Sequence, residues 1–110
     1  MTSQEINEAI LRSLGYDNKK DGREVRWHKT EPSGTLVINE RLPDFATNLK
    51  AIYDAEWELS QEEHERFVVE LSDIAGRDYP GEATPEFAVV SACAKQRAEA
   101  WLRVRGKWQP

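Results

Sequence analysis

Two charged residues of this chain fall on or beside rows of apolar side chains, where an ionised group needs a partner. Glu56 lies between Ile52 and Leu59 in one such row, and Arg97 falls along another near the C-terminus. A buried charge is costly unless it is paired, and the forked guanidinium of arginine suits a carboxylate. We therefore predict that Arg97 pairs with Glu56 or Asp54 and fixes how two helices dock. A functional role for the pair is the alternative.

Catalytic and metal-binding residue types form no known pattern in the sequence. His28 and His64 are the two histidines and Cys93 is the single cysteine, and none stands in a local signature with a second catalytic group. Paired cysteines or histidines at metal-ligand spacing are missing, as is a glycine-rich phosphate loop. We expect no catalytic residue, no metal and no cofactor, and we interpret Cys93 as a small core residue within a helix.

Acidic residues gather in the middle of the chain, although the net charge is only −5. Residues 39–83 hold four basic and twelve acidic side chains, whereas residues 84–110 hold five basic and two acidic ones. The simplest interpretation is that these two segments pack together and their charges complement one another. The sharper one is an exposed acidic patch that binds a basic partner, in the manner of a phosphate backbone. Its members would be Glu56, Glu58, Glu62, Glu63, Glu65 and Asp73.

The C-terminal tip combines a tryptophan with positive charge. Trp108 lies beyond Gly106, outside any helical period, and its basic neighbours are Arg103, Arg105 and Lys107. Either Trp108 folds back onto a β-hairpin near Trp27, which we favour, or it stays exposed as an anchor for a protein partner. The same grouping could stack a nucleobase and neutralise phosphates, so a nucleic acid is a second possible ligand of the tip.

Apolar periodicity and capping residues predict four helices. Capping boxes at Thr2–Glu5 and at Ser60–Glu63 mark two helix starts. The expected helices cover about residues 3–14, 44–59, 60–75 and 84–107. Asp44 caps the second, or that helix begins one residue earlier; Gly76 ends the third and Thr84 caps the fourth. In the last helix, Phe87, Val90, Ala94, Ala98, Trp101 and Leu102 would form the buried face, while Lys95, Glu99 and Arg103 would face solvent.

Between the first two helices, the sequence predicts a loop and a hairpin. Residues 16–24 are rich in Asp, Asn, Lys and Gly, which is typical of a solvated loop. Residues 24–29 and 35–39 alternate or carry β-branched side chains around a Glu31-Pro-Ser-Gly turn. We expect one α+β domain over residues 1–110, with about four helices packed on this short antiparallel hairpin. No long apolar run or signal peptide is evident, so we expect a cytosolic protein without a membrane span.

Two segments resemble a known family of small phage proteins. One runs from Leu42 to Glu56, and the other runs from Ser91 to Trp108 and includes Gln96-Arg97-Ala98-Glu99-Ala100. Together they resemble the phage ABA-sandwich domain family, named for a sheet layered between helices. The resemblance implies an origin in a phage or integrated prophage and action in the cytoplasm of an infected bacterium. It supplies no catalytic residues.

Three classes of function remain open at the level of sequence. The first is a phage accessory protein that binds a host or phage protein, with inhibition of a host defence component or of a nucleic-acid-handling system as one form. The second is a nucleic-acid binder that uses the basic tip, and the third is a structural protein of the phage, with a homodimer as one arrangement. We rank protein binding first and enzymatic activity last.

Overall fold

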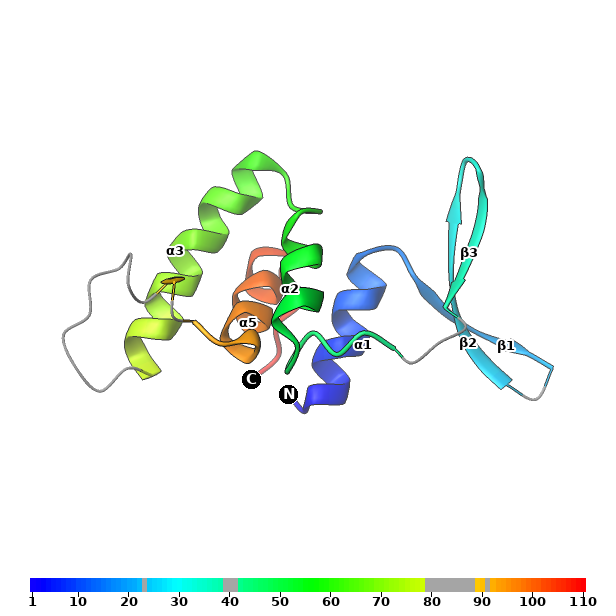
Figure 1. The fold of residues 1–110 in the computed structure, drawn as a ribbon, viewed down its shortest axis with the longest axis horizontal. Coiled ribbons are helices and arrows are strands. Elements are labelled where there is room, and N and C mark those ends of the chain that lie inside the picture. Colours follow the sequence, from blue (N-terminus) through cyan, green and yellow to red (C-terminus); the bar gives the residue numbers. More distant parts are fainter. Residues whose placement is uncertain (23, 39–41, 79–88, 91) are drawn as a thin grey trace.

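The structure is a computed structural model, and it describes residues 1–22, 24–38, 42–78, 89–90 and 92–110. Within these residues the chain forms four helices and a three-stranded antiparallel sheet, which confirms the expected α+β class. Helices and sheet follow one another along an elongated molecule, 53 × 27 × 23 Å in extent (Figure 1). The elements are α1 (Ser3–Ser13), β1 (Asp17–Asp21), β2 (Glu24–Glu31), β3 (Gly34–Ile38), α2 (Leu49–Glu56), α3 (Gln61–Asp78) and α5 (Ala94–Val104).

The expected hairpin exists as β2 and β3, but it has an additional strand. Trp27 pairs with Ile38 across the hairpin, and on its other side Trp27 pairs with Asn18 of β1. The prediction of a loop over residues 16–24 is therefore wrong. Nothing in the polar run of β1 alternates with apolar residues, so the strand owes its conformation to backbone pairing with β2. Propensity alone could not reveal it.

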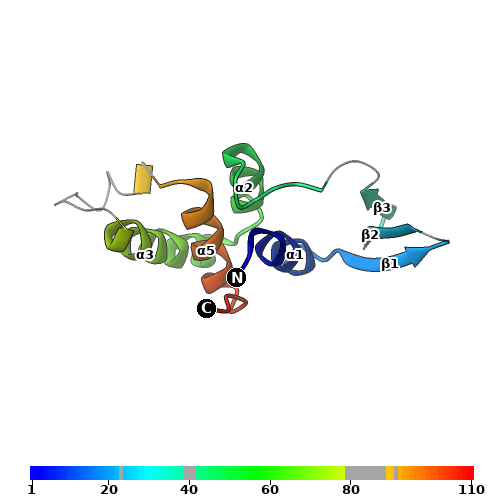
Figure 2. The ribbon, with the colours of Figure 1, turned by 90° about the horizontal axis from the view of Figure 1, so that it is seen from below.

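The sheet projects from the helices instead of carrying them. Both ribbon views place it beyond α1 at one end of the molecule (Figures 1 and 2). Trp27 belongs to the buried core, with the guanidinium of Arg12 5.0 Å from its ring centre, and Ile38 packs against the same core. The sheet thus meets the helices at its base. The expectation that the helices pack on the hairpin is wrong in this respect.

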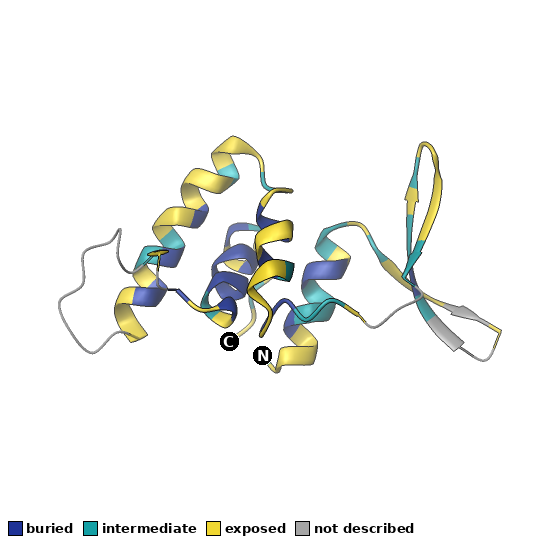
Figure 3. Ribbon diagram, viewed as in Figure 1, coloured by how far each residue is buried: buried dark blue, intermediate teal, exposed yellow. Residues whose placement is uncertain are grey.

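Helix α5 is the centre of the helical part. It packs against α3, α1 and α2, and most of its residues are buried (Figure 3). The indole nitrogen of Trp101 donates a 2.9 Å hydrogen bond to the Ala55 carbonyl, which ties α5 to α2. Because α5 has neighbours on several sides, Glu99 is buried, and the expectation that Glu99 faces solvent is wrong.

The last helix is shorter than the sequence predicts. It begins at Ala94 with Cys93 as its N-cap, and the Cys93 amide donates to the side-chain oxygen of Gln96 at 2.9 Å. Cys93 is consequently exposed, which corrects its interpretation as a core residue, and Val90 is exposed as well. Gly106, with φ +68°, follows the helix as expected. The proposed cap Thr84 and the apolar residue Phe87 lie outside the described residues.

The other helix boundaries divide into confirmed and corrected ones. Both capping boxes are present, at Thr2–Glu5 and at Ser60–Glu63. Helix α2 starts later than expected, because Asn48 and not Asp44 caps it. The Asp44 side chain instead accepts a hydrogen bond from Asn7 of α1. Helix α3 continues through the exposed Gly76 to Asp78, so a glycine in a helix weakens it without ending it.

Among the described helices, none is both long enough and apolar enough to cross a membrane.

Candidate functional site

Arg97 and Glu56 form the predicted ion pair. The Nη1 atom of Arg97 donates to Oε1 of Glu56 at 2.8 Å, and both residues are buried between α5 and α2. A second donor of Arg97, Nη2, reaches the Val89 carbonyl at 2.9 Å. The alternative partner, Asp54, lies 3.5 Å from Lys50 on the surface of α2. The pair therefore holds the two helices together, as the sequence indicates.

Burial dominates the electrostatics of this pair. Desolvation raises the pKa of the Glu56 carboxyl, and the positive charge of Arg97 only partly opposes it. Within the described part of the chain, Oε2 of Glu56 and Nε of Arg97 are buried without a hydrogen-bond partner. Glu56 is therefore a structural carboxylate and is not available to an external partner.

The outer side of α2 carries a row of large apolar side chains. Leu49, Tyr53 and Trp57 follow one another at four-residue spacing, and their exposed fractions are 42, 40 and 86%. We call these three residues the α2 surface. The apolar spacing of this segment predicts that Leu49 and Tyr53 line the inner side of the helix, and this prediction is wrong because both are exposed. The helix instead buries Ile52, Ala55 and Glu56. The sequence signal for this exposed row was the four-residue spacing from Tyr53 to Trp57.

Two contacts hold the start of α2 and the Tyr53 ring in place. Asn48 caps the helix through a 3.2 Å hydrogen bond from the Ala51 amide to its side-chain oxygen. The Tyr53 ring lies 4.8 Å from the guanidinium carbon of Arg97, which Glu56 holds in place. An aromatic side chain fixed in this way loses little conformational freedom when a partner covers it.

The predicted acidic patch separates into internal and exposed carboxylates. Glu56 pairs with Arg97, and Glu63 pairs with Arg105 at 2.7 Å while its carboxylate also caps α3. The hydrogen bond from the Ser60 amide is the main reason why the pKa of Glu63 is lowered. The other four members, Glu58, Glu62, Glu65 and Asp73, are exposed.

The two arginines of the C-terminal tip are used inside the fold. Arg105 meets Glu63, donates from Nη2 to the Glu58 carbonyl at 3.2 Å, and lies 4.9 Å from the Trp101 ring centre. Arg103 donates to Glu99 at 2.9 Å. Only Lys107 among the three basic residues of the tip lacks an ion pair within the described structure and is exposed.

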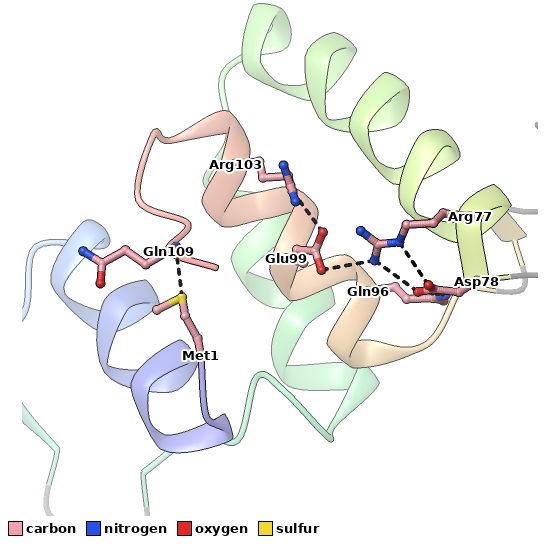
Figure 4. Close-up of polar contacts among 7 residues, drawn as sticks. All are labelled: Met1, Arg77, Asp78, Gln96, Glu99, Arg103 and Gln109. Atoms are coloured by element: carbon pink, nitrogen blue, oxygen red, sulfur yellow. Dashed lines mark hydrogen bonds and ion pairs between the residues drawn. The ribbon is translucent and has the colours of Figure 1, made fainter.

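Trp108 folds back, but not onto the hairpin. It is partly buried against the core, with the Arg103 guanidinium 5.8 Å from its ring centre. The next residue, Gln109, donates its amide to the sulfur of Met1 at 3.4 Å, so the tip reaches the start of α1 (Figure 4). The folded-back alternative is thus confirmed, whereas its expected position near Trp27 is wrong.

A polar cluster joins the end of α3 to α5 beside this tip. Arg77 contacts Asp78 and also reaches Glu99 at 3.5 Å, and Gln96 donates to Asp78 at 3.2 Å (Figure 4). These contacts, that of Arg77 first, lower the pKa of the Asp78 carboxyl. These side chains satisfy one another's charges and hydrogen-bonding groups, so the cluster joins α3 to α5. Among the described residues, no group of three histidine, cysteine or acidic side chains could hold a metal ion.

A cavity of about 370 Å³ lies on the neighbouring side of α2. Its lining comes from α1, the base of the sheet, residues 43–48 and α2. The side chains around it are mainly apolar, and the four charged lining residues, which we call its rim, are Lys29, Lys50, Asp54 and Glu58. Sequence reasoning missed this cavity because it depends on where the sheet attaches. Its volume is within the range of about 300–1,000 Å³ that is usual for ligand pockets.

Comparison with known proteins gives no relative: no protein-family model, no curated protein and no solved structure matches the chain. The layered sandwich that the phage resemblance implies also differs from the arrangement observed, because the sheet lies at one end and not between helices.

Proposed function

We propose that this chain is a small accessory protein that acts by binding another protein through the α2 surface. The observation that carries the proposal is the 86% exposure of Trp57, in line with Tyr53 and Leu49 on a capped helix. Leaving a large apolar side chain in water is unfavourable, and tryptophan and tyrosine are enriched at the energetic centres of protein interfaces. A protein partner that covers this row would remove the unfavourable exposure.

Protein binding is better supported than nucleic-acid binding. Arg103 and Arg105 would have to leave Glu99 and Glu63 before they could contact phosphates. The exposed carboxylates Glu58, Glu62 and Glu65 would repel a phosphate backbone, and the whole chain has a net charge of −5. These features disfavour the basic tip as a nucleic-acid site.

A phage or prophage origin is part of the proposal. It is supported by the resemblance of residues 42–56 and 91–108 to small phage proteins, and the first of these segments contains Leu49 and Tyr53. The partner would then be a host or phage protein in the bacterial cytoplasm. A component of host defence or of nucleic-acid handling is the class of target that we propose.

Capture from a bacterial lysate tests the proposal. The immobilised chain, its Trp57→Ala variant and a Val69→Ala variant would be compared, with retained proteins identified by mass spectrometry. Val69 is a matched control, since it is also apolar and 62% exposed but lies on α3. We expect a protein retained by the wild type and by Val69→Ala and lost with Trp57→Ala. Equal retention by all three would contradict the proposed function.

A further inference from the structure

The cavity beside α2 offers apolar surface that the fold leaves partly uncovered. Leu14, Tyr16, Ile38 and Ala51 line it, and each is only partly buried although it packs against the core. Ala51 belongs to α2, so the cavity and the α2 surface occupy neighbouring sides of one helix. A segment lying across α2 can therefore contact Trp57 and extend an apolar side chain into the cavity.

The rim of the cavity carries charged side chains of both signs, and they differ in whether they already form an ion pair. Lys29 lies 3.6 Å from Glu31, and Lys50 lies 3.5 Å from Asp54. Glu58 also lines the cavity, and its carboxylate has no ion-pair partner within the described structure. With Glu31 included, these two lysines and three carboxylates sum to a charge of −1 at the rim.

The chain that follows Glu58 adds negative charge along α3, which runs away from the cavity (Figure 1). Residues 42–78 contain three basic and ten acidic side chains. Beyond Glu58, the exposed carboxylates of Glu62, Glu65 and Asp73 follow along α3 without an ion pair among the described residues. Such a field attracts a cationic partner and repels an anionic one.

We infer that the partner presents a basic amphipathic segment to this side of the molecule. A large apolar side chain of the segment enters the cavity beside α2, and a neighbouring Lys or Arg meets Glu58. This inference rests on the proposed function and specifies the chemistry of the partner. A second copy of the chain is the poorer occupant, because it would bring the same acidic surface and a net charge of −5.

Fluorescence anisotropy with designed peptides tests the inference. The first probe is a labelled 18-residue helix with leucine and phenylalanine on one face and lysine on the other. The second replaces each lysine by glutamate, and the third is an oligolysine of equal charge. We expect the first peptide to bind at least about tenfold more tightly than either control, with an affinity that falls as salt rises from 50 to 300 mM.

Two substitutions locate the bound peptide. Ala51→Phe fills the cavity and Glu58→Lys reverses the charge at its rim, and each should weaken binding of the first peptide by about tenfold or more. Asp73→Lys makes the same change in net charge about 16 Å beyond Glu62 along α3, at 1.5 Å per residue, and should weaken binding by less than about threefold. Thermal melting of each variant verifies its fold. Because Glu58 is exposed, its substitution remains informative if Ala51→Phe does not fold.

The outcomes separate this inference from the proposed function. Equal binding of the basic and acidic helices, or unchanged binding by folded Ala51→Phe and Glu58→Lys, would overturn the inference. Lysate capture that depends on Trp57 would still support the proposed function in that case. Peptide-sensitive dimers of the chain, seen by sedimentation, would assign the surface to a second copy and would also overturn the inference.

Discussion

The helical body, formed by α1, α2, α3 and α5, and the projecting sheet are stabilised in different ways. Leu102 in α5 is 0% exposed, whereas Leu36 in β3 is 47% exposed. The Arg97–Glu56 ion pair of the body is buried at 2.8 Å, while the Lys29–Glu31 pair of the sheet is partly exposed at 3.6 Å. The body therefore depends on burial, and the sheet depends on backbone pairing and on its attachment through Trp27.

Removing one member of each ion pair should give the largest contrast. Arg97→Ala leaves Glu56 buried and unpaired, and should cost about 3–5 kcal/mol of unfolding free energy. Lys29→Ala in the sheet should cost less than about 1 kcal/mol, because a partly exposed pair is screened by solvent. Urea denaturation measures both. Similar losses for the two variants would contradict the contrast between body and sheet.

A matched pair of leucines tests the same contrast for packing. Leu102→Ala creates a cavity beside Trp101 in the core and should cost about 2–5 kcal/mol. Leu36→Ala removes a side chain that already faces water, and should change stability by less than about 1 kcal/mol. Thermal melting of the two variants measures both changes in stability. A large loss with Leu36→Ala would mean that the sheet is covered by something in solution.

Acid should destabilise the protein mainly through the helical body. The carboxyl groups of Glu5 and Glu63 have lowered pKa values because they accept backbone hydrogen bonds at the capping boxes of α1 and α3. A lowered pKa contributes stability above the ordinary value of 4.5, and this contribution is lost as pH falls through the folded pKa. Glu56 acts with the opposite sign, since its raised pKa favours the protonated form on acidification.

Denaturant midpoints measured between pH 7 and pH 3 would test this balance. We expect stability to decline below about pH 4.5, with a shallower decline in a Glu5→Gln, Glu63→Gln double variant that lacks both titrating carboxyl groups. An equal pH dependence of wild type and double variant would show that the capping boxes are not responsible. An increase in stability on acidification would mean that Glu56 dominates.

Local sequence signals predicted the starts of α1 and α3 and the β2–β3 hairpin, but they did not predict strand β1 or the starts of α2 and α5. Capping boxes depend on residues three apart, and they identified the starts of α1 and α3. The Arg97–Glu56 pair could be inferred because a charge beside an apolar row requires a partner. Strand β1 could not be inferred, since its polar residues become a strand only by pairing with β2.

The candidate site was missed for a related reason. Apolar residues on both sides of α2 made Leu49 and Tyr53 resemble core residues, and only tertiary packing determines which side is covered. Similarly, Arg105 has the composition of a binding residue but is used to join α1, α3 and the turn after α2. For Arg105, the sequence did not indicate whether its contacts would be internal or external.

The most direct test compares two tryptophans that the fold uses differently. Trp57 is exposed on α2, and Trp108 is folded against the core. Affinity for the captured partner and melting temperature are measured for both alanine variants. We predict that Trp57→Ala weakens binding by at least about tenfold and leaves the melting temperature unchanged. Trp108→Ala should lower the melting temperature and leave the affinity within about threefold of wild type. Retained affinity in Trp57→Ala, together with loss of binding in a stably folded Trp108→Ala, would contradict the assignment of the α2 surface as the binding site.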